Sequence, residues 1–359
     1  MTGISTASFP MKGGDGAYSY ANNSSYQREG LECAEDLIKE SVAEKLDMKE
    51  FISSSSSPKL FTIADLGCSF GPNTLFVVEN IIHSVELKYH SFGQNQEALE
   101  FLVLFSDRAS NDFNTLFRSL PSDKKYFAAG VPGLFQDRLV PKASLNFVHC
   151  SYSLHWLSKI PMELMDRDSP AWNKGRIFYN HSPDEVSEAY SAQFAKDMEY
   201  FLNARAEELV CGGLMALVVP CIPDGISKLE FSDFKFLDLM EESLKDMVDV
   251  GLLTEDKVDS FNLPLYQPTP VELGALIERN RRFSIEKMQR IVRPARKGYG
   301  LQSLISMIRA IWEELIQDHF GTDIVDELFD RLKKKIAESN LSSLEMVADM
   351  YVLLRRKID

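Results

Sequence analysis

The sequence predicts an α/β fold in which a mostly parallel sheet is covered by helices on both faces. Two observations carry this prediction. Continuous apolar runs of strand length recur at 61–66, 101–106, 145–148 and 214–219. Stretches with apolar residues at helical spacing stand beside these runs, at 28–50, 74–89 and 184–210. Such alternation is typical of a buried parallel sheet whose strands are joined by helices.

The remaining segments add a closing strand, two loops and further helices. Residues 351–354 are predicted to form the closing strand, and the serine run 53–57 and the polar stretch 93–98 are expected loops. Residues 222–282 and 300–340 are expected to be mostly helical, which is more helix than a doubly wound sheet requires. We therefore expect a helical cap over the carboxyl edge of the sheet.

Composition limits the classes of partner. The chain has 359 residues with a formal charge of -14, so it should repel phosphate backbones. Its five cysteines are an odd number without a CxxC pair, which argues against a disulfide framework or a structural zinc site. No stretch has the length and apolarity of a membrane span or a signal peptide. We expect a cytoplasmic protein that binds neither nucleic acid nor membrane.

The segment 65–73, DLGCSFGPN, joins a predicted strand to a predicted helix. Gly67 and Gly71 allow a tight turn and a close approach of ligand to backbone. Asp107 ends the next strand, where doubly wound folds bind ribose hydroxyls. The GxxxG spacing and the absence of Lys or Arg in the turn disfavour a pyrophosphate. S-adenosylmethionine has a ribose and no phosphate, and its ammonium group suits Asp65. The alternative is a turn that binds no ligand.

The segment 151–158, SYSLHWLS, directly follows the predicted strand 145–148. It therefore lies at the carboxyl edge of the sheet, where open α/β folds bind ligands. Tyr152, His155 and Trp156 bring three polar-tipped aromatic rings to this edge. This composition favours a binding site over a purely structural role.

Seven strings in this sequence occur in the order in which a known family has them. They are MKGGDGAYSY, NSSYQ, IADLGCSFGPN, NDFNTLFRSLP, GVPGLFQDR, SYSLHWLSK and VDSFNLPLY. From about residue 11 to the carboxyl terminus the chain resembles the SABATH family of plant methyltransferases. The resemblance implies a Rossmann-like class I methyltransferase sheet with an α-helical cap, usually dimeric. It implies methylation of small acids such as salicylate or jasmonate, with a branch that N-methylates xanthine alkaloids.

The resemblance also implies the residues of the site. Implied S-adenosylmethionine contacts are Tyr20, Cys68, Asn73, Asp107 and Phe135, with Asp65 beside them. Arg108 and Leu134 stand at positions that lie near the adenine in the family and are counted with these contacts. Implied acceptor contacts are Gln27, Tyr152, His155 and Trp156, of which Gln27 and Trp156 act in catalysis. An implied Mg²⁺ site lies near Asn173, Asp259, Phe261 and Asn262. The cap is expected to shape the acid pocket, through residues 222–236, Ile308 and Ile311.

The resemblance and the pattern together suggest a division of the chain. Residues 1–30 should lie over the active site. The cofactor-binding domain should comprise 31–221, 283–300 and 345–359. The cap should comprise 222–282 and 301–344.

Four residues depart from the family pattern: Phe70, Ser106, Arg108 and Leu134. Leu134 replaces a serine that ordinarily lies near the adenine, so a non-catalytic binder with a decayed cofactor site stays an alternative. A second alternative is N-methylation of a purine-like substrate, which Gln27 together with Trp156 disfavours. A third is an NADP-dependent oxidoreductase that uses Arg108 for a 2′-phosphate, which the missing GxGxxG disfavours.

Esterification of an acid sets simple chemical demands. A carboxylic acid with a pKa of about 4 is already an anion at cytosolic pH, so no general base is needed. In-line displacement requires the carboxylate oxygen and the methyl carbon to approach to about 3 Å with water excluded. Because the charges cancel as the bond forms, strong hydrogen bonds would stabilise the ground state more than the transition state. The neutral donors of Gln27 and Trp156 meet this demand.

Overall fold

The computed structural model describes residues 10–53, 59–93, 99–229, 231, 234–293, 300–339 and 348–358. Most of the two expected loops, 53–57 and 93–98, lies outside the described residues. So do residues 1–9, 294–299, 340–347 and 359 of the expected domains, and 230, 232 and 233 of the expected pocket segment. Within the described residues no helix is long and apolar enough to cross a membrane.

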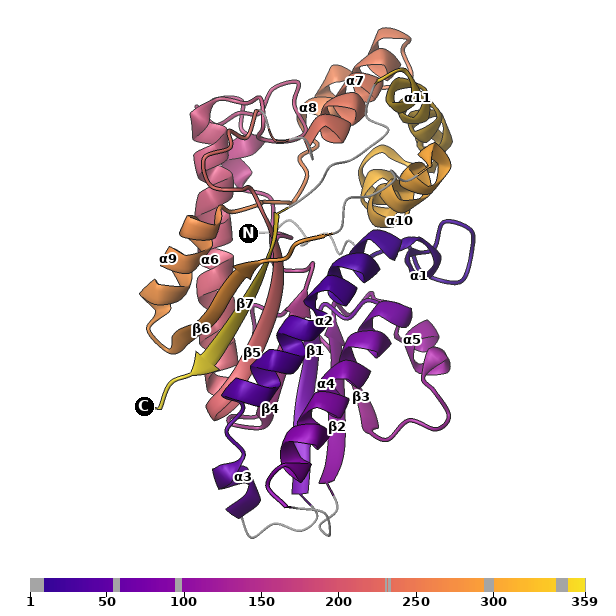
Figure 1. Cartoon of the computed structure of the whole chain (residues 1–359). Helices are drawn as coiled ribbons and strands as arrows, with labels where there is room; N and C mark the ends of the chain where they lie inside the picture. The colour runs from indigo at the N-terminus through magenta and orange to yellow at the C-terminus, as the bar shows by residue number, and fades with distance from the viewer. Residues whose placement is uncertain are drawn as a thin grey trace.

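A seven-stranded sheet in the order β3-β2-β1-β4-β5-β7-β6 forms the centre of the described structure (Figure 1). The strands are β1 (Lys59–Leu66), β2 (Leu99–Asp107), β3 (Phe127–Pro132), β4 (Leu145–Ser151), β5 (Leu209–Cys221), β6 (Phe283–Arg290) and β7 (Ala348–Arg356). The first five are parallel, and β7 runs antiparallel to both of its neighbours. The α/β sheet is therefore as expected, with the four apolar runs and the closing strand as β1, β2, β4, β5 and β7.

Two strands carry no clear signal in the sequence. Both β3 and β6 lie at the edges of the sheet, and most of their residues are exposed or half-buried. An edge strand buries too little to need a continuous apolar run.

Helices cover the sheet on both faces (Figure 1). They are α1 (Tyr20–Asn23), α2 (Ser25–Lys45), α3 (Lys49–Ser53), α4 (Pro72–His90), α5 (Phe113–Ser119), α6 (Asp184–Glu208), α7 (Lys235–Asp249), α8 (Glu255–Asp259), α9 (Pro270–Asn280), α10 (Leu301–Phe320) and α11 (Val325–Glu338). Local chemistry sets several of the starts. Pro72 opens α4, and the Asp112 side chain accepts from Thr115 N at the start of α5.

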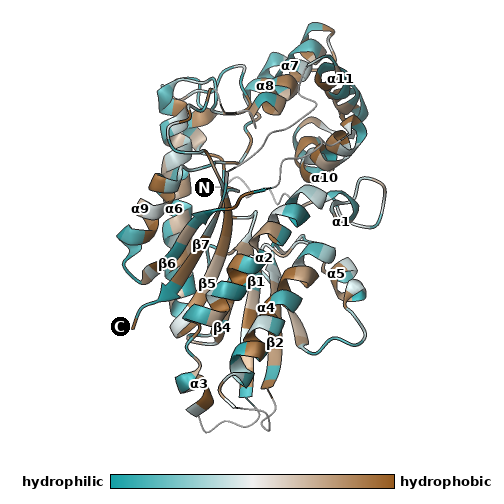
Figure 2. Ribbon diagram, in the orientation of Figure 1, coloured by the Kyte–Doolittle hydropathy of each residue, from teal (hydrophilic) through white to brown (hydrophobic). Residues whose placement is uncertain are grey.

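Alternate residues of the central strands divide between two cores. Leu214 and Ala216 of β5 pack into the core beneath α2 and α4. Met215 and Leu217 pack into the core shared by α6 and the helices 235–259 and 301–338. Figure 2 shows the central strands in hydrophobic colours and the outer faces of the surface helices in hydrophilic ones. This is the pattern of a sheet buried on both faces.

The helices α7, α8, α10 and α11 stand together beyond the carboxyl ends of the parallel strands (Figure 1). α11 packs against both α7 and α10, and α10 also packs against α1. In contrast, α9 packs against α6 and β6 beside the sheet, although the expected cap range 222–282 includes it. The domain boundaries stay a prediction.

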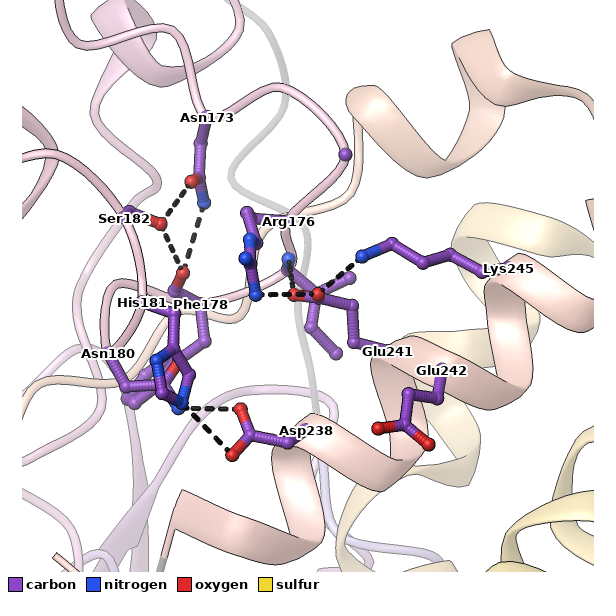
Figure 3. A network of polar contacts seen from close by, with 12 residues as sticks. Asn173, Arg176, Phe178, Asn180, His181, Ser182, Asp238, Glu241, Glu242 and Lys245 are labelled. Carbon is purple, nitrogen blue, oxygen red and sulfur yellow. Dashed lines mark hydrogen bonds and ion pairs between the residues drawn. The ribbon is translucent and has the colours of Figure 1, made fainter. Parts of the chain in front are cut away.

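Polar contacts join α7 to the segment 173–182 (Figure 3). Asn180 Nδ2 donates to Asp238 Oδ1 at 2.7 Å. Glu241 is buried and accepts from Arg176 Nη1 at 3.0 Å and from the main-chain N–H of Ile177 at 3.3 Å. These bonds hold the first helix of the cap against the chain that follows β4.

Candidate active site

A cavity of about 1380 Å³, counting its open mouth, lies at the carboxyl edge of the sheet. Its walls come from the N-terminal segment, from the ends of β1, β2 and β4, and from α10. A smaller cavity of about 390 Å³ adjoins it, and the two share Tyr20, Gln27, Gly67, Ser69, Ser151 and Tyr152. The expected position of the site, where parallel strands end, is the position of the larger cavity.

Most of the residues expected in the site line these cavities. The larger cavity is lined by Tyr20, Gln27, Asp107, Arg108, Phe135, Tyr152, His155 and Trp156. The smaller cavity is lined by Asp65, Cys68 and Asn73. Leu134 is half-buried and lines neither of the two. The role of each residue toward a ligand stays a prediction.

Gly67 allows two segments of the cavity wall to meet. Its φ is +73°, and a Cβ at this position would stand 1.9 Å from Ser153 Oγ. The main-chain N–H groups of Gly67 and Cys68 both donate to Ser106 O, at 2.8 and 3.1 Å. A larger residue would therefore separate the turn after β1 from the segment after β4.

Asp107 presents a held carboxylate to the larger cavity. Its Oδ2 accepts from Ser69 N and its Oδ1 from Arg108 N, each at 2.7 Å. Burial raises the pKa of this carboxyl, against the lowering effect of the two N–H donors. Each oxygen keeps a lone pair after these bonds, so the group can accept from two vicinal hydroxyls. This is the chemistry that a ribose requires.

Asp65 is held by partners in the protein interior. Its Oδ1 lies 2.7 Å from His149 Nδ1, and its Oδ2 accepts from the Thr74 hydroxyl. All three side chains are buried. A contact with a cofactor ammonium would have to share these oxygens with His149 and Thr74.

Arg205 and Glu208 are buried charged residues that hold the loop after β3 in place. The sequence did not identify them as part of the site. Arg205 donates from Nη1 to Phe135 O at 2.9 Å and from Nη2 to Asp137 O at 2.8 Å. Glu208 accepts from Val140 N at 3.1 Å. Arg205 Nε and Glu208 Oε2 lie 2.7 Å apart, without the alignment of a hydrogen bond. Their position on the inner face of the helix 184–210 is the signal that could have revealed them.

The end of the larger cavity where the acceptor is predicted to bind is mostly apolar and aromatic. Trp156 packs at a tilt on Trp312 of α10, with ring centroids 5.8 Å apart. Ile308 and Ile311 line this end as expected, and Phe236 lines it from the expected range 222–236. Trp312 and Met307 also line it and were missed. Their spacing from Ile308 and Ile311 along α10 places them on one face, which a helical wheel would have shown.

Tyr152 and Gln27 differ in what they offer to an acceptor. The Tyr152 hydroxyl donates to Asp349 Oδ2 at 2.8 Å and accepts from Arg293 Nη2 at 2.7 Å. It therefore has no further proton to donate to an acceptor. The Tyr152 backbone has a φ of +53°, which is uncommon for a non-glycine residue. Gln27 is buried, and its Oε1 has no hydrogen-bond partner among the described residues. Gln27 is therefore the freer polar group of the two.

The buried side chain of His155 leads to a prediction about how the free energy of unfolding depends on pH. Burial lowers its pKa from about 6.5 to about 3, and its Nδ1 has no partner among the described residues. Between these pKa values the unfolded chain binds a proton that the folded chain does not, so acidification favours unfolding. From pH 7 to pH 5 this should lower the free energy of unfolding by at most about 2 kcal/mol.

Denaturant unfolding at the two pH values measures this effect. His155→Gln should lose that part of the pH dependence, whereas the exposed His83→Gln should keep it. An unchanged pH dependence in His155→Gln would show that the imidazole titrates freely in the folded protein.

The four residues of the expected Mg²⁺ site lie together, outside both cavities. Asn173 donates from Nδ2 to Asn262 Oδ1 at 2.8 Å. Its Oδ1 accepts from the Ser182 hydroxyl at 2.6 Å (Figure 3). Asp259 Oδ1 accepts from Gly175 N at 2.7 Å, and Phe261 packs on Phe320. Among the described residues no group of three His, Cys, Asp or Glu could hold a metal. One carboxylate with amide and carbonyl oxygens fits only a weakly held Mg²⁺.

Comparison with known proteins agrees with this geometry. The sequence profile described as "SAM dependent carboxyl methyltransferase" matches residues 6–357. Loganic acid O-methyltransferase of Catharanthus roseus is 44% identical over 354 residues, which are 97% of this chain and 94% of the relative. Paraxanthine methyltransferase 2 of Arabidopsis thaliana is 39% identical over 358 residues, 98% and 99% of the two chains. A solved structure of loganic acid methyltransferase with SAH superposes with a TM-score of 0.93 at 43% identity, covering 98% of this chain and 99% of the other.

Proposed function

Because this chain belongs to the family of SAM-dependent carboxyl methyltransferases, we propose that it forms the methyl ester of a small organic acid. It is an α/β enzyme that uses S-adenosylmethionine. The observation that carries the proposal is the joint position of Gln27 and Trp156 in one cavity with Asp107. Two residues with neutral donor groups thus line the same cavity as a carboxylate suited to the ribose of the cofactor.

The proposed mechanism needs orientation and exclusion of water, and no base. S-adenosylmethionine supplies an electrophilic methyl group when it is bound. Gln27 and Trp156 orient the carboxylate, and the aromatic walls keep water away. Among the described residues Arg108 is the one Lys or Arg that lines the larger cavity, and it stands beside Asp107. Weak neutral contacts at the acceptor end leave the carboxylate reactive.

A methyl-transfer assay with a panel of acids tests the function. We propose loganic acid as the first acid to try, because the relative from Catharanthus roseus and the solved structure compared above carry its name. Paraxanthine should be included, because a relative of the other class carries its name. Label released by mild alkali marks an ester. Label that resists alkali would mean N-methylation, and cofactor binding with no transfer to any compound would mean a non-catalytic binder.

Trp156→Phe keeps an aromatic ring and removes the N–H. We expect kcat/KM for the acid to fall about tenfold or more, since one orienting hydrogen bond to a charged group is worth about 1.5–3 kcal/mol. The affinity for S-adenosylmethionine should not change. Trp172→Phe is the matched control, because Trp172 does not line either cavity. Full activity of Trp156→Phe would remove Trp156 from the acceptor site.

We also propose that Asn173, Asp259, Phe261 and Asn262 bind Mg²⁺ weakly, with a structural role. Mg²⁺ at about ten times its Kd should raise the free energy of unfolding by about 1.4 kcal/mol. Thermal unfolding with MgCl₂, against NaCl at equal ionic strength, measures this. Asp259→Asn should abolish the response, and a response that persists in this variant would place the ion elsewhere.

The proposal extends to the oligomeric state of the protein and to its location in the cell. We propose a homodimer in the cytoplasm, on the basis of the family resemblance and the cysteine composition. Light scattering at micromolar concentration tests the dimer, and a fluorescent fusion tests the location.

A further inference from the structure

We propose that Arg293 and Asp349 form a buried clamp that positions α2, and with it Gln27, against the acceptor carboxylate. They are positioning residues, because they act through Tyr152 and the start of α2. The inference rests on the proposed acid acceptor.

Arg293 binds the chain at three points. Its Nε donates to Asp349 Oδ2 at 3.0 Å, and its Nη2 to the Tyr152 hydroxyl at 2.7 Å. Its Nη1 donates to Tyr26 O at 2.9 Å, and the guanidinium lies 4.1 Å from the centre of the Tyr26 ring. Tyr26 directly precedes Gln27, so the guanidinium holds the turn of α2 that carries the predicted acceptor ligand.

The clamp is almost closed from solvent and its charge is balanced. The side chain of Asp349 is 0% exposed and that of Arg293 is 10% exposed. Arg293 Nη1 also lies 3.6 Å from Glu29 Oε2. Two carboxylates thus face one guanidinium, which leaves no net positive charge to hold the acceptor. The clamp can therefore fix the geometry of Gln27 without forming an ion pair with the substrate.

Gly30 gives independent support. It lies inside α2, where glycine is a poor helix former. A Cβ at this position would stand 1.7 Å from Tyr152 Oη and 2.5 Å from Arg293 Nη2. The close approach of the helix to the clamp explains why glycine stands here.

The clamp residues come from a part of the sheet that contributes little to the cavity walls. Asp349 lies in β7, and Arg293 follows β6. Both strands lie beyond β5 in the sheet. They therefore serve the site from a distance, by anchoring the helix that lies over it.

Kinetics of Asp349→Asn test the clamp. A small misplacement of an orienting group can cost about 10²-fold in rate. We expect kcat for the acid to fall by up to that factor, with KM changed less and the affinity for S-adenosylmethionine kept. Arg293→Lys keeps the positive charge but loses the planar guanidinium that donates in several directions, so it should behave in the same way. The control is Glu286→Gln, which breaks a partly buried pair with Arg355 on the same two strands and a pair with Lys45 at the opposite end of α2. It should keep wild-type kinetics.

A double variant shows whether the clamp acts through Gln27. Added to Gln27→Ala, the change Asp349→Asn should cause little further loss, because the group that the clamp positions is already gone. If the two losses multiply, the clamp does not work through Gln27 and the proposal is wrong. Wild-type kinetics in Asp349→Asn would also overturn it.

Amide hydrogen exchange tests the clamp without any substrate. Residues 26–30 should exchange faster in Asp349→Asn than in wild type, whereas Glu286→Gln should leave them unchanged. If Asp349→Asn fails to fold, Gly30→Ala replaces it, since this change displaces the Tyr152 hydroxyl and removes no charge. Unchanged exchange at 26–30 in the variant used overturns the clamp. A wild type that methylates no acid would overturn the proposed function alone.

Discussion

Replacing Arg205 by methionine is expected to lower the free energy of unfolding by about 3–5 kcal/mol. Arg205 and Glu208 are both 0% exposed, so the substitution leaves a buried carboxylate without its charge partner. It also leaves Phe135 O and Asp137 O without their donors. Urea unfolding measures the loss.

The same variant should bind S-adenosylmethionine more weakly, because the loop that carries Phe135 loses its anchor. Arg282→Met is the control, since Arg282 pairs at 2.9 Å with Glu207 near the surface, where ion pairs contribute little. If the two variants were equally stable, the buried pair would not be what holds this loop.

Asp107→Ala should weaken the binding of S-adenosylmethionine by about 10²-fold or more. A carboxylate that accepts from two ribose hydroxyls makes two charge-assisted hydrogen bonds, each worth about 1.5–3 kcal/mol. The change also leaves Ser69 N and Arg108 N without their acceptor. Asp107→Asn should be intermediate, because the amide keeps one acceptor oxygen. Isothermal titration calorimetry measures all three proteins.

Asp112→Asn separates this effect from general loss of structure. Asp112 also accepts from two main-chain N–H groups, Gly14 N at 3.0 Å and Thr115 N at 2.9 Å, but it does not line either cavity. Its substitution should leave the Kd unchanged. An unchanged Kd in Asp107→Ala would move the ribose away from the end of β2.

The inner strands and the position of the candidate site could be predicted from the sequence alone. Both follow from local properties: continuous apolar runs predict buried strands, and a turn with Gly67 must accommodate φ above zero. Because parallel strands end at one edge, Asp107 and Trp156 could be placed together without knowing how the sheet packs. The motifs 65–73 and 151–158 predict the parts of the cavity walls that lie at the ends of β1 and β4.

Which distant residues support these motifs follows only from the folded structure. β3 and β6 lie at edges and bury too little to show a pattern, so their place in the sheet depends on their neighbours. Nothing near Tyr152 in the sequence indicates that Asp349 would accept the hydrogen bond from its hydroxyl. Leu134 adjoins Phe135 in the sequence, and yet only Phe135 lines the cavity. A buried charge or hydroxyl must find a partner wherever packing brings one, and that partner is a property of the folded chain.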